Sequence, residues 1–309
     1  PLYITALYSF KDDEKLSESA KAAKKLVLEV IMDEMLHMNL LNNIISSIYG
    51  VSKVTTKFNI PYGKDCKLPA QVRADVTNVS LKPFCKQSLY DAFIQIEAPT
   101  TLVDQHQPEK QEDGSLRYPF EPKKGEDSVT LTFQKRDHLN QIGEFYNAIE
   151  VALKRLSEQK LISFTADDKE HKQRQCKSRK KDTDDITELQ DALEAIELIC
   201  TQGEGYELKE GVFAGVQKSD GDDNPENDLQ TSEKTHFIKF IECLVGRELV
   251  SLKCVKDTKE TVTYTFTYDG KASAYKVDFE NEVYSMQNFV KPAPAEMFNK
   301  YYKEMLEKL

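Results

Sequence analysis

The sequence predicts a mainly α-helical protein: a four-helix bundle with a long crossover insertion and a small C-terminal β-hairpin region. Four segments repeat apolar residues at spacings of three and four, as the buried face of a helix does. Roughly ninety residues separate the first two of these segments, far more than an ordinary loop. Near the C-terminus one segment alternates apolar and polar residues, which is typical of strands.

The first strong helix is predicted from about Glu18 to Ile48, because Leu26 and Ile44 share its apolar face and Gly50 ends the pattern. Before it, the stretch from Pro1 to Phe10 is expected to be the end of a further helix. That stretch begins with apolar and aromatic residues and has no Met or cap before it, which indicates a processed or incompletely determined N-terminus.

The other bundle helices are predicted from the same spacing. They cover about Leu139 to Gln159, the stretch from the acidic start Asp184-Asp185 to Gly203, and about Ser232 to Val245. A charged amphipathic helix is expected from Ala295 to Leu309.

Between the first two strong helices, residues 51–138 are expected to form an ordered crossover with its own small strands or turns. Residues Thr261 to Tyr268 alternate strictly, and Asp269-Gly270 predicts a hairpin turn that leads into Ala272 to Phe279. The whole chain, 1–309, is therefore predicted to be a single domain. Its bundle helices are expected within 1–50 and 139–247, its insertion at 51–138, and its hairpin and last helix at 250–309.

Composition excludes several classes of protein. With 42 Lys and Arg against 52 Asp and Glu, the net charge of −10 argues against broad nucleic-acid binding. The basic stretch from Lys172 to Lys181 has acids on both sides, so a solvated loop is favoured over a partner site. No apolar run is long enough to span a membrane. The six cysteines lack CxxC spacing, which argues against structural zinc, although Cys66 and Cys85 could pair in an oxidising compartment.

Two acid–histidine pairs are the strongest candidates for chemistry. Glu34 and His37 lie on the apolar stripe of the first strong helix, and Glu233 and His236 stand three residues apart in the last. One such pair is more often a local contact, but two pairs on apolar faces favour a shared metal. Glu-x-x-His on each of two helices, with a Glu from each of the other two, is the di-iron carboxylate arrangement. In the other two bundle helices, Glu144 is the preferred further carboxylate and Glu197 the reserve candidate.

At these residues the chain resembles the ferritin-like domain of the iminophenylpyruvate dimer synthase family, which acts in violacein- and rebeccamycin-type pigment pathways. The matching stretches are PLYITALYS (1–9), DEMLHMNLLNNII (33–45), LKPF (81–84), IQIEAP (94–99), IGEFYNAI (142–149), DITELQDALEAIELICTQGEG (185–205) and EKTHFIKFIECLVGREL (233–249).

The resemblance implies a ferritin-like bundle whose metal ligands are Glu34, His37, Glu144, Glu233 and His236. It also implies a further Glu a few residues before the first matching stretch, upstream of Pro1. The cofactors expected from it are two iron ions, with manganese as the alternative.

The first hypothesis is an O₂-dependent dimetal oxidoreductase acting on a small organic molecule. The second is a non-catalytic ferritin-like protein with a structural or assembly role and a vestigial site, and iron storage ranks third. A homo-oligomer, the catalytic residues and the compartment stay open.

Overall fold

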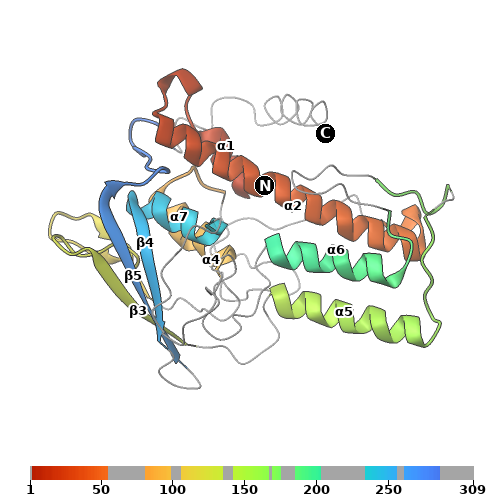
Figure 1. The fold of residues 1–309 in the computed structure, drawn as a ribbon. Coiled ribbons are helices and arrows are strands. Elements are labelled where there is room, and N and C mark those ends of the chain that lie inside the picture. Colours follow the sequence, from red (N-terminus) through yellow and green to blue (C-terminus); the bar gives the residue numbers. More distant parts are fainter. Residues whose placement is uncertain are drawn as a thin grey trace.

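The structure, a computed structural model, describes residues 2–54, 81–98, 106–134, 142–166, 169–174, 185–202, 234–255 and 261–285. The long helix α2 crosses the molecule, with α7 and a three-stranded sheet near its first half and with α5 and α6 along its second half (Figure 1). The helices are α1 (Leu2–Ser9), α2 (Glu18–Tyr49), α3 (Lys86–Ser88), the π turn η4 (Leu89–Phe93), α4 (Ile94–Ile96), α5 (Ile142–Glu158), α6 (Leu189–Gln202) and α7 (His236–Val245). The strands are β1 (Glu109–Lys110), β2 (Leu116–Arg117), β3 (Ser128–Gln134), β4 (Arg247–Val255) and β5 (Thr261–Ala272).

Both ends of α2 are capped in the structure. The Ser17 hydroxyl accepts a hydrogen bond from the backbone N–H of Ala20 at 3.2 Å, which caps the first turn. At the other end Gly50 adopts a φ of +82° and donates its N–H to the Ser46 carbonyl at 2.9 Å. The predicted first strong helix is therefore confirmed.

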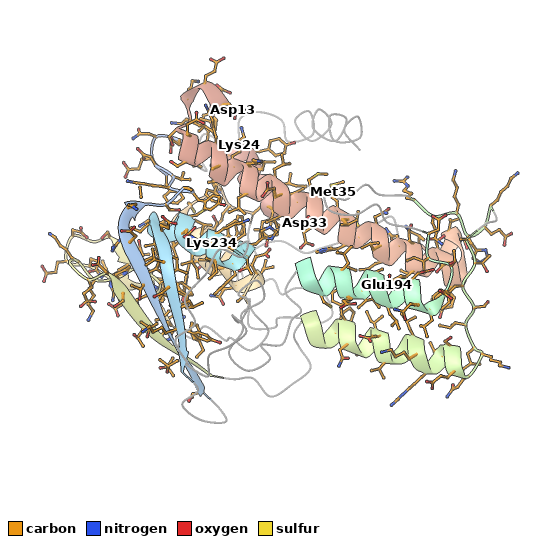
Figure 2. The ribbon with its side chains drawn as sticks, in the orientation of Figure 1. Asp13, Lys24, Asp33, Met35, Glu194 and Lys234 are labelled. Carbon is orange, nitrogen blue, oxygen red and sulfur yellow. The ribbon has the colours of Figure 1, made fainter. Side chains whose placement is uncertain are left out.

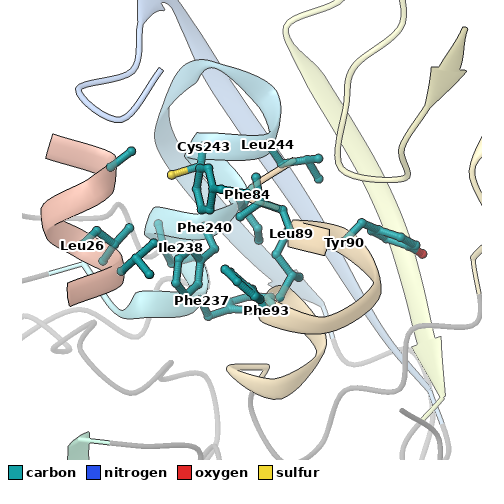
Figure 3. Packing of buried hydrophobic residues seen from close by; sticks show 14 of the residues in the cluster. Leu26, Phe84, Leu89, Tyr90, Phe93, Phe237, Ile238, Phe240, Cys243 and Leu244 are labelled. Atoms are coloured by element: carbon teal, nitrogen blue, oxygen red, sulfur yellow. The ribbon is translucent and has the colours of Figure 1, made fainter. Parts of the chain in front are cut away.

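A first core joins α1, the first half of α2, the segment 81–98, α7 and the inner face of the sheet. It is rich in aromatic rings, among which Phe93 and Phe240 lie with their centroids 5.3 Å apart (Figure 3). Both rings are fully buried. The helical segment 81–98 belongs to the crossover insertion, so this part of the insertion is ordered and fills the core, as expected.

A second core lies further along α2. There Leu36, Leu40 and Ile44 are buried against apolar residues of α5 and α6, such as Leu153 and Ile196. Of the four bundle helices predicted from the sequence, α2 contributes to both cores, α7 packs in the first core, and α5 and α6 pack in the second. The mainly α character is confirmed, whereas a single four-helix bundle is not confirmed in the described part of the chain.

The sheet has the strand order β3–β5–β4, and both pairs are antiparallel. The alternation of β5 is as predicted, because Tyr264, Phe266 and Tyr268 are buried on its inner face. The predicted turn at Asp269-Gly270 is wrong, since β5 runs through these residues and pairs with β4 instead. The register between β4 and β5 shifts at this point, and Arg247 Nε donates to the Asp269 carbonyl at 2.9 Å, which keeps the strand in place.

Two helices begin later than predicted. Near α6, the Asp191 carboxylate accepts the backbone N–H groups of Thr187 and Glu188, so the helix begins only at Leu189. Helix α7 begins at His236 and not at Ser232, because the hydroxyl of Thr235 accepts the N–H of Ile238 and caps the helix there. The predicted helix from Ala295 to Leu309 lies outside the described residues.

Other predictions from the sequence can be compared with the described residues. Cys85 is a free thiol in the structure, and Cys66 lies outside the described residues, so the pairing of the two stays a prediction. Cys243 is buried in the first core. Within the described ranges, no helix has the length and apolar character needed to cross a membrane.

Candidate metal centre

The middle of α2 carries the first predicted acid–histidine pair. His37 is buried, with 6% of its surface exposed. Glu34, one turn earlier, keeps surface that is accessible to solvent although protein surrounds it on most sides. The neighbouring Asp33 lies midway along α2 (Figure 2) and has a side chain that is 33% exposed.

His236, the first residue of α7, lies between two carboxylates. Its Nδ1 is 3.7 Å from Oε2 of Glu97, and its Nε2 is 3.8 Å from Oδ2 of Asp33. Both separations are longer than a hydrogen bond, so these are charge contacts. The structure therefore brings α2, α7 and the residue that follows α4 together around one imidazole.

Glu97 is held in place from its other side. The Tyr3 hydroxyl donates to Oε1 of Glu97 at 2.6 Å, and the Glu97 side chain is only 6% exposed. The backbone N–H of Glu97 also donates to the Phe93 carbonyl at 3.0 Å. The start of α1 thus contacts the cluster through Tyr3.

The charges of this cluster influence one another. Surrounding protein and the negative charges of Glu97 and Asp33 raise the pKa of Glu34 to about 7, against a smaller opposite effect of His236. Because Glu97 and Asp33 repel a negative charge on Glu34, the pKa of Glu34 is raised even though its side chain keeps accessible surface. Burial lowers the pKa of His236, but the attraction of Glu97 and Asp33 outweighs it, so that the pKa is raised.

The structure describes the predicted ligands only in part. Glu34, His37 and His236 are described, and electrostatic interaction links Glu34 to His236. Glu144 lies in the first turn of α5, but its side chain is not among those described, and Glu233 lies outside the described residues. Helix α7 begins at His236, and the placement of Glu233 relative to this helix lies outside the described residues. The two glutamates stay predictions as ligands.

Sequence reasoning missed Glu97 and Asp33 as members of the cluster. Glu97 lies in the stretch Ile94–Pro99, which was recognised only as part of the resemblance. A signal was present, since this Glu follows the apolar run Ala92, Phe93 and Ile94. Asp33 gave no signal beyond standing next to Glu34.

The donor chemistry of the cluster suits iron or manganese, because it consists of carboxylate oxygens and imidazole nitrogens without thiolates. The cluster also places three acids near one another, and a cation would relieve their repulsion. Among the residues that the structure describes, no three such side chains are close enough to hold one ion as they stand. The residues fit a metal in type and charge, and the side chains of Glu144 and Glu233 are the ones that would have to complete the coordination.

A hollow of about 680 Å³ lies beside β2 and β3. Its charged lining includes Arg117, which already forms an ion pair with Glu109 and donates to the Glu121 carbonyl. This hollow has no connection with the candidate ligands.

Comparison with known proteins gives one finding. A family model described as Ferritin-like matches residues 1–244. Searches of curated proteins and of solved structures found no match. The match ends within α7, so the prediction of one domain over residues 1–309 stays a prediction.

Proposed function

The chain belongs to the Ferritin-like family, and we propose that it is a non-haem dimetal carboxylate protein that oxidises a small organic molecule with O₂. The proposed cofactors are two iron ions, with manganese as the alternative. The proposed ligands are Glu34, His37, Glu144, Glu233 and His236.

One observation carries the proposal. Glu34, Glu97 and Asp33 approach one another and His236 at a junction between two helices and the inserted segment. Negative charges collected in this way disfavour one another unless a cation or a proton neutralises them. A pair of metal ions is the neutralising partner that the family membership supports.

The chain's own residues would bind and shield such a centre. Glu34, Glu144 and Glu233 would hold the metals through carboxylate oxygens, and His37 and His236 would hold them through imidazole nitrogens. The chemistry that such a centre would supply is the activation of O₂. The buried aromatic rings around Phe93 and Phe240 would keep water away from one side of the centre.

The resemblance to the iminophenylpyruvate dimer synthase family favours oxidation over iron storage. A non-catalytic role with a vestigial site is the second candidate function. It is favoured by the long insertion between the first two bundle helices, part of which packs into the first core.

Elemental analysis of protein purified without chelator tests the proposal. We expect close to two iron or manganese ions per chain in the wild type and a loss of metal in the double variant Glu34→Ala/His236→Ala. The matched control is Glu194→Ala/His106→Ala, which removes an exposed Glu of α6 and a histidine that contacts the Thr132 carbonyl. Wild-type protein without metal, even after anaerobic addition of Fe(II), would overturn the proposal and leave the non-catalytic role.

A further inference from the structure

We infer that Tyr3 and Glu97 form a positioning pair that fixes the imidazole of His236, so that its Nε2 faces the candidate metal centre on the side of Asp33. The part of this inference that concerns the metal rests on the proposed function. The part that concerns the imidazole rests on geometry alone.

The two oxygens of Glu97 have separate partners. Oε1 accepts the Tyr3 hydroxyl at 2.6 Å, and Oε2 faces His236 Nδ1 at 3.7 Å. A carboxylate with one oxygen bonded to a phenol can rotate little, so its other oxygen stays directed at the imidazole. Tyr3 and Glu97 are 94 residues apart in the chain, and only the fold brings them together.

The same aromatic core holds all three residues. The centroid of the Tyr3 ring lies 4.7 Å from that of Phe93, and the Tyr3 ring stacks with the Phe240 ring at a centroid distance of 6.3 Å. Phe93 lies four residues before Glu97, and Phe240 lies four residues after His236 on α7. Tyr3 therefore touches both the segment that carries Glu97 and the helix that carries His236, and this packing fixes their relative positions.

This arrangement selects one tautomer of the neutral imidazole. Both ring nitrogens face a carboxylate at a similar distance, but Glu97 is anchored by Tyr3 and only 6% exposed, whereas the Asp33 side chain is 33% exposed. Solvent therefore screens the attraction of Asp33 more than that of Glu97, which favours the proton on Nδ1 and leaves the lone pair on Nε2. Nε2 faces Asp33 Oδ2 at 3.8 Å, in the direction of α2. Metal-binding histidines in proteins nearly always donate their other ring N–H to a carboxylate or a carbonyl in this way. Asp33 is then the carboxylate beside the nitrogen that would bind metal.

The first experiment measures the tautomer of His236 in chelator-treated protein with ¹⁵N-labelled histidine, at an alkaline pH where the ¹⁵N shifts show that the ring is neutral. We expect the Nδ1–H form in the wild type. Glu97→Ala should move His236 towards the Nε2–H form, and Tyr3→Phe should give a mixture, since Glu97 loses its anchor. The control is Tyr90→Phe, which removes a phenol that donates to the His106 carbonyl. If the folded variants Tyr3→Phe and Glu97→Ala give the same ¹⁵N spectrum at His236 as the wild type, the positioning role of Tyr3 and Glu97 is overturned.

The second experiment titrates Co(II) into the same proteins and follows its visible absorption. Loss of a residue that orients a metal-binding histidine typically weakens binding about 10- to 100-fold. We expect that loss in Tyr3→Phe, a partial rescue in Glu97→Gln relative to Glu97→Ala, and no change in Tyr90→Phe. Equal affinity in wild type and Tyr3→Phe would overturn the metal part of the inference. If the wild type binds no Co(II), that part and the proposed function both fall, while the tautomer measurement still decides the positioning of His236.

Discussion

Replacing Glu34 with Gln should stabilise the metal-free protein at high pH. The surrounding protein, and then the negative charges of Glu97 and Asp33, raise the pKa of Glu34 from 4.5 to about 7. That difference sets an upper limit of about 3.4 kcal/mol on the cost of ionising Glu34 in the folded state. Because the side chain keeps accessible surface, water screens much of this cost, and we expect about 1 kcal/mol.

The sign follows from proton linkage. Between pH 4.5 and about 7 the folded chain keeps a proton on Glu34 that the unfolded chain has lost. Stability therefore falls as the pH rises through this window, and the cost is complete above it. Gln has no charge at any pH, so Glu34→Gln should match the wild type near pH 4 and be more stable by about 1 kcal/mol near pH 8.

Urea unfolding of chelator-treated protein, followed by circular dichroism at about pH 4, 6 and 8, measures this difference. The control is Glu194→Gln, the same substitution at an exposed position of α6. A difference between Glu34→Gln and wild type that does not change with pH, or that favours the wild type at pH 8, would refute the reasoning.

Three further substitutions test how the fold positions the candidate centre, each by urea unfolding. Glu242→Ala removes a buried carboxylate that forms an ion pair with Lys234 at 2.6 Å; we expect a loss of about 2–3 kcal/mol, limited because Lys234 still reaches water. Gly50→Ala should cost about 1–2 kcal/mol, since φ is +82° and the new Cβ would lie 3.0 Å from the Glu170 carbonyl oxygen. Thr235→Ala removes the cap of α7 and should cost about 1 kcal/mol. Losses under about 0.5 kcal/mol would contradict these assignments.

The sequence predicts helix α2 well because its signals are local. The apolar spacing, the hydroxyl of Ser17 and the φ of Gly50 each depend on neighbours within a turn. Helix α7 starts later than its apolar spacing indicates, because the hydroxyl of Thr235 caps it just before His236.

In strand β5, pairing with the neighbouring strands overrides a local turn signal. Asp269-Gly270 is a strong turn sequence, yet the strand continues because β4 and β3 flank it and Arg247 binds the Asp269 carbonyl. The choice of partner strand depends on residues far away in the chain, and an alternating pattern within one strand does not indicate which partner it pairs with.

The candidate site was predictable where it lies on a regular helix. Glu34 and His37 interrupt an apolar stripe, where polar groups are costly without a partner, so the pair is visible in the sequence. The contacts of Glu97 with Tyr3 and His236 join three segments that are distant in sequence. Such contacts follow from tertiary packing, and no spacing rule contains them.

Anomalous X-ray diffraction from crystals grown with Fe(II) or Mn(II) under anaerobic conditions tests the central claim most directly. The account predicts anomalous peaks bonded to side chains at the junction of α2 and α7, with Glu34 and His236 among the ligands. No anomalous peak at this junction, or peaks only in the hollow beside β2 and β3, would contradict the assignment of a metal centre to these residues.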